Sequence, residues 1–232
     1  MSPSTAASTS TRGSSSTSAE PQRLRSALAT GPFRLYPRLR PPRRGSTARK
    51  GGRALSAERH QIAELIATGK DGRMYATEPD RLRRLVHFEL AREPRLPQPE
   101  LRQAGVGLIA LGDFAAAQKV LAAAVDRAET PQQQVAALVN LGDAHRYPGR
   151  LDAAEAHYRR AIELARTRCP DYVHYTLQHY GKHLIDARRP HLAVDVLTEV
   201  LEIRERIGDP ALIASTQDAL SVARAAVGQR TI

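Results

Sequence analysis

Residues 135–168, VAALVNLGDAHRYPGRLDAAEAHYRRAIELARTR, decide the fold of this chain because they contain two amphipathic patterns separated by a turn. In the first half, Leu138, Leu141 and His145 recur at the spacing of one helix face. The second half repeats that spacing at Ala154, Tyr158, Ala161 and Leu164. Between the two stripes, Pro148 ends the first helix and Gly149 supplies the left-handed conformation that is common at helix C-termini. The stretch therefore predicts two antiparallel helices joined by a tight turn.

The same pattern occurs again before and after this stretch. Its small residues recur in one phase, as Gly105, Gly142 and Gly181 and as Ala117, Ala154 and Ala193. A glycine in the middle of a helix costs about 1 kcal/mol relative to alanine. We therefore expect Gly142 and Ala154 to be small because the backbones of two helices approach each other closely there.

These units resemble the tetratricopeptide repeat, a helix-turn-helix of about 34 residues with large, small and aromatic residues at set places. Those places hold Leu138, Leu141, Gly142, His145, Ala154, Tyr158 and Ala161. The spacing here is slightly long, 37 and then 39 residues between equivalent glycines. It is similar to the subgroup found in kinesin light chains and bacterial regulators. The resemblance implies an all-α fold, a right-handed α-solenoid of antiparallel helix pairs.

Prolines and caps divide the chain into segments. Pro99, Pro131, Pro170 and Pro210 each precede an apolar stripe, as expected in the first turn of a helix. The predicted segments are a tail at 1–55, a helical pair at 56–97, repeats at 98–134, 135–173 and 174–208, and a C-terminal capping helix at 209–228. The pair at 56–97 is either a degenerate repeat or a cap, with its first helix at 56–68 and its second starting near Thr77.

The N-terminal tail carries almost all of the net charge. Residues 1–54 contain 11 Lys and Arg against Glu20 alone, whereas the rest of the chain has 24 basic and 23 acidic residues. We predict that the tail is disordered, since Ser, Thr, Pro and Arg cannot bury enough apolar surface to offset the ordering entropy. It is a solvated tail, a contact for nucleic acid or an anionic membrane surface, or an untranslated leader ahead of Met74.

Cysteine and hydropathy constrain the compartment. A single cysteine excludes an internal disulfide and is typical of a reducing environment. The sequence has no run of about 18 apolar residues that would span a membrane and no apolar core of a secretory signal. We therefore expect a cytoplasmic protein without a membrane span.

The sequence has no enzyme signature and suggests no cofactor. The Walker, nucleophile-elbow, zincin, CxxC and dinucleotide-binding patterns are all missing. His179, His183 and Asp186 share one helix face, with His174 a turn earlier, and are a weak candidate for a metal site of an enzyme. Cys169 precedes a predicted helix, whose dipole would lower the pKa of its thiol.

By resemblance to tetratricopeptide repeats, the first helix of each unit lines a concave surface that binds a protein or peptide. The residues predicted there are Arg102, Asn140, Asp143, Arg146, Tyr147, Tyr175, Gln178, His179, Lys182 and Asp186. In the chaperone-binding subgroup, Lys and Asn grip a terminal carboxylate; the matching places here hold Arg102, Val106, Val139, Asp143, Gln178 and Lys182. We expect Asp143 to repel such a carboxylate. The predicted function is non-enzymatic protein interaction, with a nucleic-acid-associated regulator that uses the tail as the alternative.

Overall fold

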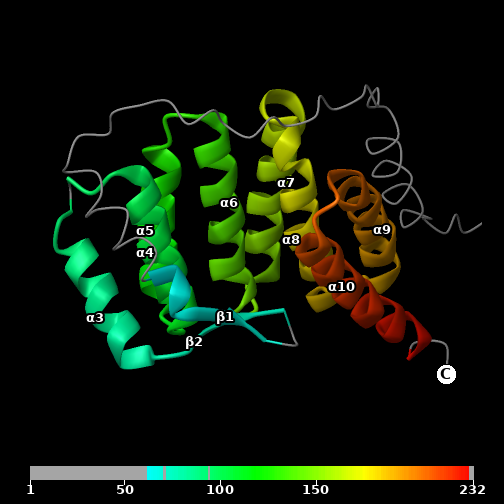
Figure 1. Ribbon diagram of the computed structural model, residues 1–232, viewed down its shortest axis with the longest axis horizontal. Coiled ribbons are helices and arrows are strands. Elements are labelled where there is room, and N and C mark those ends of the chain that lie inside the picture. Colours follow the sequence, from blue (N-terminus) through cyan, green and yellow to red (C-terminus); the bar gives the residue numbers. More distant parts are fainter. Residues whose placement is uncertain (1–61, 70–71, 94, 230–232) are drawn as a thin grey trace, which may run out of the picture. The chain divides into compact units, whose positions relative to one another are not determined.

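The computed structural model describes residues 62–69, 72–93 and 95–229, which form a short β-hairpin followed by a run of α-helices (Figure 1). The hairpin consists of β1 (Ile66–Thr68) and β2 (Met74–Ala76). The helices are α3 (Pro79–Leu90), α4 (Gln98–Ala110), α5 (Phe114–Asp126), α6 (Pro131–Arg146), α7 (Leu151–Arg168), α8 (Val173–Asp186), α9 (Pro190–Ile207) and α10 (Pro210–Gly228), with the 3-10 turn η1 (Pro170–Tyr172) before α8. The predicted tail at 1–55 lies outside the described residues.

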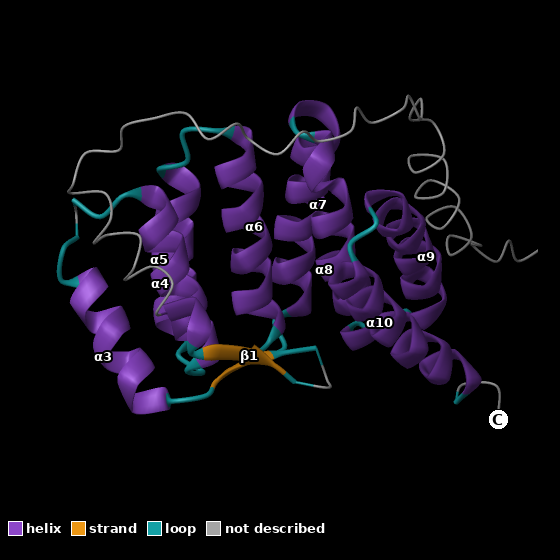
Figure 2. Ribbon diagram, viewed as in Figure 1, coloured by secondary structure: helices purple, strands orange, loops and turns teal. Residues whose placement is uncertain are grey.

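The helices from α4 onward stack as pairs (Figure 2). Each packs against the next, giving the pairs α4 with α5, α6 with α7, and α8 with α9. The first helices also touch one another, α4 with α6, α6 with α8, and α8 with α10. The all-α repeat architecture predicted from the sequence is therefore confirmed. The exact repeat boundaries remain a prediction, and α6 starts at Pro131, ahead of the predicted boundary at 135.

Local sequence explains where the helices of the central pair begin and end. Thr130 caps α6, since its side chain accepts a hydrogen bond from the backbone N–H of Gln133 at 3.2 Å. Gly149 has a φ of 84°, so it provides the left-handed turn expected after α6. In the corresponding turn between α8 and α9, Arg188 takes up that conformation with a φ of 55°, which is uncommon for a residue with a side chain. The turns inside both helix pairs therefore contain a residue with positive φ, although only the first of them uses glycine.

The recurring glycines lie where the two helices of each pair meet. A Cβ atom at Gly105, Gly142 or Gly181 would come within 2.6 Å of the side chains of Leu121, Tyr158 and Leu197, respectively. The small residue on the first helix therefore admits a large residue of the second helix. The predicted close helix contact at Gly142 is present, and its nearest atoms belong to the ring of Tyr158.

The N-terminal segment corrects one prediction. A helix was expected to reach Thr68, but only 62–64 are helical and Ile66–Thr68 form β1, paired antiparallel with Met74–Ala76. β-Branched residues favour the strand, and Gly72, with a φ of 72°, helps the chain to turn between the two strands. The hairpin is also held from a distance, because the hydroxyl of Tyr147 accepts a hydrogen bond from Met74 N–H at 3.0 Å. Residues 56–61 lie outside the described residues.

The last helix, α10, has one buried face and one solvent-exposed face. Thr216, Ala219, Leu220 and Ala223 are buried, whereas Val222 is 46% exposed. The buried side packs against α9 and α8, an arrangement suited to closing a stack of repeats. Among the described residues, no helix combines the length and hydropathy needed to span a membrane.

Candidate functional site

The side chains predicted to bind a partner lie on the layer of first helices. Arg102 is on α4, Asn140, Asp143 and Arg146 are on α6, Tyr147 directly follows α6, and Tyr175, Gln178, His179, Lys182 and Asp186 are on α8. The structure places them on neighbouring helices but in different environments. Some form an accessible edge, some are buried, and others lie against the hairpin. Their role in binding remains a prediction.

The accessible edge is a chain of hydrogen bonds across α4, α6 and α8, which we call the polar ladder and which consists of Arg102, Asn140 and Tyr175. Arg102 Nη1 donates to Asn140 Oδ1 at 2.9 Å, and Asn140 Nδ2 donates to the Tyr175 hydroxyl at 3.4 Å. Asn140 is buried, while Arg102 and Tyr175 remain partly exposed. The ring of His179 packs edge-on against Tyr175, with centroids 4.8 Å apart. Arg102 on α4 and Tyr175 on α8 are thus linked through Asn140 on α6, so the ladder connects three successive first helices.

Asp143 is the centre of a buried charge cluster. Its side chain is fully buried, and Oδ1 accepts a hydrogen bond from the Tyr158 hydroxyl at 2.7 Å. Arg146 Nη2 lies 3.3 Å from Oδ1, and His179 Nδ1 lies 2.7 Å from Oδ2. Burial alone would raise the pKa of Asp143, but His179 and Arg146 together hold it well below its usual range. The carboxylate is therefore ionised and compensated within the protein.

This cluster corrects the expected reason for rejecting a terminal carboxylate. Asp143 was expected to repel such a group, yet its side chain is covered, Arg146 compensates its charge, and the His179 ring lies against its second carboxylate oxygen. Two other positions that match the clamp are also unable to contact a ligand freely. Val139 is fully buried. The Gln178 side chain is hydrogen-bonded to α10, where it donates to the Ser215 carbonyl and accepts from the Thr216 hydroxyl. Among the six matching places only Lys182 is a lysine, and its side chain lies against the hairpin at Gly72.

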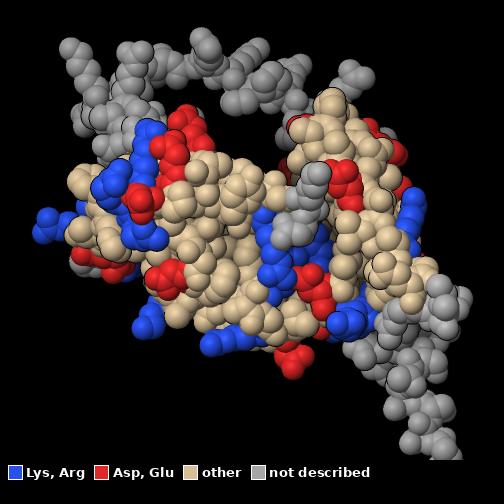
Figure 3. Space-filling model, turned by 90° about the horizontal axis from the view of Figure 1, so that it is seen from below, with Lys and Arg blue, Asp and Glu red and all other residues tan. Residues whose placement is uncertain are grey.

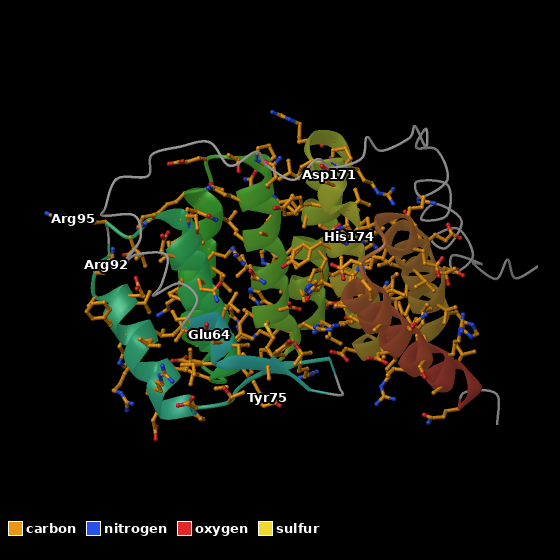
Figure 4. The ribbon with its side chains drawn as sticks, in the orientation of Figure 1. Glu64, Tyr75, Arg92, Arg95, Asp171 and His174 are labelled. Carbon is orange, nitrogen blue, oxygen red and sulfur yellow. The ribbon has the colours of Figure 1, made fainter. Side chains whose placement is uncertain are left out.

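The hairpin contributes Arg73, which sequence reasoning missed. Arg73 Nη2 donates to Asp186 Oδ2 at 3.0 Å, and Nη1 donates to the Tyr147 carbonyl at 3.0 Å. The guanidinium also lies over the Tyr147 ring, 5.1 Å from its centroid. Tyr147, predicted as a binding residue, is therefore engaged by the hairpin, and burial raises its pKa to about 12. On the outer side of the hairpin, Tyr75 is half exposed (Figure 4).

Lys182 faces a cavity of about 510 Å³ between the hairpin, α8 and α10. Its Nζ lies against the hairpin, 3.3 Å from where a Cβ atom at Gly72 would be. Arg73, Arg146 and Asp186 also line the cavity. On this face, Lys and Arg atoms gather in a hollow beside Asp and Glu atoms (Figure 3). Burial, and then the charge of Arg146, lowers the pKa of Lys182.

The residues considered for a metal site are not brought together. His179 contacts Asp143, and Asp186 contacts Arg73. His183 is fully buried on another side of α8, with Nε2 3.6 Å from Glu155. His174 lies toward the start of α8 (Figure 4), where its Nδ1 accepts from Arg204 Nε at 3.3 Å. Across the described part of the chain, no cluster of His, Cys, Asp and Glu is arranged to hold a metal.

Cys169 does not have the activated thiol that its position suggested. It is buried at the C-terminus of α7, and burial, followed by the charge of Asp171, raises the pKa of its thiol. The expectation of a lowered pKa is wrong because burial and the neighbouring carboxylate of Asp171 both disfavour the thiolate.

Comparison with known proteins agrees with the repeats found in the sequence. Residues 101–167 match the family model of the Tetratricopeptide repeat. A crystal structure from Podosopora anserina, described as a kinesin light chain with nearly identical TPR-like repeats, superimposes with a TM-score of 0.53 at 14% identity, covering 79% of this chain and 91% of that one. No curated protein matches the chain. The predicted resemblance to tetratricopeptide repeats is confirmed over residues 101–167, and the structural likeness shows the shared fold.

Proposed function

We propose that this chain of tetratricopeptide repeats is a non-enzymatic interaction module that binds a peptide or a helix of a partner protein along its layer of first helices. Tetratricopeptide repeats are generally protein-interaction modules. The observation that supports the proposal here is the polar ladder, because it joins α4, α6 and α8 and leaves Arg102 and Tyr175 partly exposed to solvent. A cytoplasmic location is part of the proposal and is supported by the single cysteine.

The chemistry of the ladder favours recognition of a polypeptide. Among the described residues, Arg102 makes one hydrogen bond, to Asn140, and its remaining N–H groups are available for a ligand. Such donors suit main-chain carbonyls and acidic side chains, and the neighbouring Tyr175 ring adds apolar contact area. Asn140 fixes both groups from beneath, so they are ordered before a partner arrives and lose little entropy on binding. An extended peptide and an amphipathic helix both remain compatible with this surface.

A selection from a displayed random-peptide library against the full-length protein tests the proposal. Selected peptides should bind the Arg102→Ala variant at least about tenfold more weakly, a loss that corresponds to removing one central interface contact. The matched control is Arg160→Ala, which removes the same side chain from an exposed position on α7. Thermal melts of both variants check that the fold is intact.

Equal affinity of the parent, Arg102→Ala and Arg160→Ala for every selected peptide would place binding away from the ladder and contradict the proposal. A selection that returns no binding peptide would contradict it as well. Tyr175→Ala is a second variant on the same surface, and it should weaken the same peptides if they lie along the ladder.

A further inference from the structure

His145 on α6 and His157 on α7 form a stacked pair of imidazole rings within the central pair of helices. Their ring centroids are 5.1 Å apart, and the two ring planes make an angle of 27°. Both side chains are half-buried, so the rings contribute to the contact between α6 and α7. Neither ring belongs to the polar ladder, and neither lines the cavity beside Lys182.

The charged groups that act on this histidine pair are cations. Arg150, which lies in the turn before α7, acts on His145, and Arg160 on α7 acts on His157. From α5, the pair's surroundings receive the uncharged side chain of Gln118, which donates to the Ala144 carbonyl and accepts from Arg150 Nη1. A proton on either ring would therefore add a positive charge beside an existing one.

The acidic side chains of the surrounding helices have other partners or face solvent. Among the residues that the structure describes, only His179 and His183 lie within ion-pair distance of a carboxylate. Asp126 on α5 and Asp152 on α7 are exposed. The ion pairs of the remaining acidic groups on α6, α7 and α8 include Asp143 with Arg146, Glu155 with Arg189, and Asp186 with Arg73.

Neutral imidazoles fit this environment, whereas imidazolium ions do not. His145 Nδ1 is buried and has no hydrogen-bond partner among the described residues. Because both nitrogens of an imidazolium ion are donors, protonation of His145 would leave Nδ1 as a buried N–H group without an acceptor. Protonation of both rings would place two like charges against each other. Burial, and then the nearby positive charges, accordingly lowers the pKa of both histidines.

We propose that the His145–His157 pair is an acid-sensitive joint, which holds α6 against α7 while both rings are neutral and loosens the central helix pair when they take up protons. Because the folded-state pKa of each histidine is lowered, the unfolded chain binds these protons more readily. The stabilisation is therefore complete above the unfolded pKa of about 6.5 and is lost as the pH falls below it. The joint does not depend on whether the polar ladder binds a partner.

The first test follows the ring protons of both histidines by NMR in the full-length parent protein while the pH is lowered. Both rings should titrate below about 6.5, the pKa of an unperturbed imidazole. Titration of either ring at or above this value would overturn the proposal. This measurement needs no variant, so it holds even if a substitution in the pair prevents folding.

The second test compares urea unfolding at pH values of about 7.5 and 5.5, which bracket the titration of histidine. The parent should unfold at a lower urea concentration at the acid pH. The double variant His145→Gln, His157→Gln should lose at least about a third of that difference, because glutamine remains polar but cannot take up a proton. The matched control is His87→Gln, His191→Gln, which replaces two exposed histidines and should keep the whole difference.

The comparison between the two double variants isolates the pair from other groups that titrate in acid. One such group is His174, since burial and then the charge of Arg204 lower its pKa to about 4. Two results of the unfolding test would overturn the proposal. The first is an acid-induced loss of stability in His145→Gln, His157→Gln that equals the loss in the parent. The second is an equal reduction of that loss in the control variant.

Discussion

Gly142 on α6 lies against the ring of Tyr158 on α7, and a Cβ atom at position 142 would come within 2.6 Å of Tyr158 Cε1. The ring cannot move away easily, because its hydroxyl donates to the buried carboxylate of Asp143 at 2.7 Å. The helix contact and the buried charge cluster are therefore coupled through one side chain.

Gly142→Ala should destabilise the protein although alanine is the better helix former. Overpacking typically costs about 1–3 kcal/mol, which exceeds the gain of about 1 kcal/mol in helix propensity. Urea unfolding measures the difference. The control is Gly228→Ala at the end of α10, where a Cβ atom would meet nothing within 4 Å, and it should leave stability unchanged or slightly higher. An unchanged unfolding midpoint for Gly142→Ala would show that the ring of Tyr158 can shift.

Asp143 should make stability depend on pH in the acid range. Its pKa is lowered in the folded protein, so its contribution is present above the unfolded pKa of about 3.9 and is lost as the pH falls further. Asp143→Asn should cost about 3–5 kcal/mol near neutral pH, because Arg146 and His179 lose a buried partner. Its stability should also change less between pH values of about 6 and 3 than that of the parent. Equal acid dependence of the two proteins, measured by chemical unfolding, would contradict this account.

Arg73 should hold the hairpin onto the helices. Arg73→Ala removes its hydrogen bonds to Asp186 and to the Tyr147 carbonyl, so the backbone amides of β2 should exchange about tenfold faster with deuterium. Exchange in the middle of α8 should stay as in the parent. Arg83→Ala is the control, because its ion pair with Asp80 is exposed. If both variants exchange alike in β2, Arg73 does not anchor the hairpin.

The last helix should stabilise the stack through its buried face. Leu220 is 2% exposed and Val222 is 46% exposed, two residues apart on α10. Leu220→Ala should therefore cost about 2–5 kcal/mol, while Val222→Ala should cost much less. Removing residues 210–232 should lower the melting temperature or the solubility, because it uncovers the apolar side of α9. A truncated chain that melts like the parent would show that α10 does not act as a cap.

Much of this architecture was determined by the sequence alone, because it depends on local periodicity. The spacing of Leu138, Leu141, Tyr158 and Ala161 predicts two helices with one buried face each. Both helices form, and α7 has the single buried face, whereas α6 is buried on nearly all sides because it packs against helices on both sides of it. Caps and turns such as Thr130 and Gly149 act within a few residues, so they too could be identified in advance. The layer of first helices that carries the candidate site follows from the same repeat.

Only the tertiary structure decided which of those polar side chains remain accessible. Arg73 meets Asp186 across 113 residues, and Met74 meets Tyr147 across 73. No local pattern encodes such pairs. Ile66–Thr68 pairs with Met74–Ala76 in a hairpin, where helical periodicity predicts a helix to Thr68. Asp143 likewise looks like a groove residue in the sequence but is fully buried. Its ionisation and the lowered pKa of Lys182 depend on burial and on charges from several helices, which exist only once the repeats are stacked.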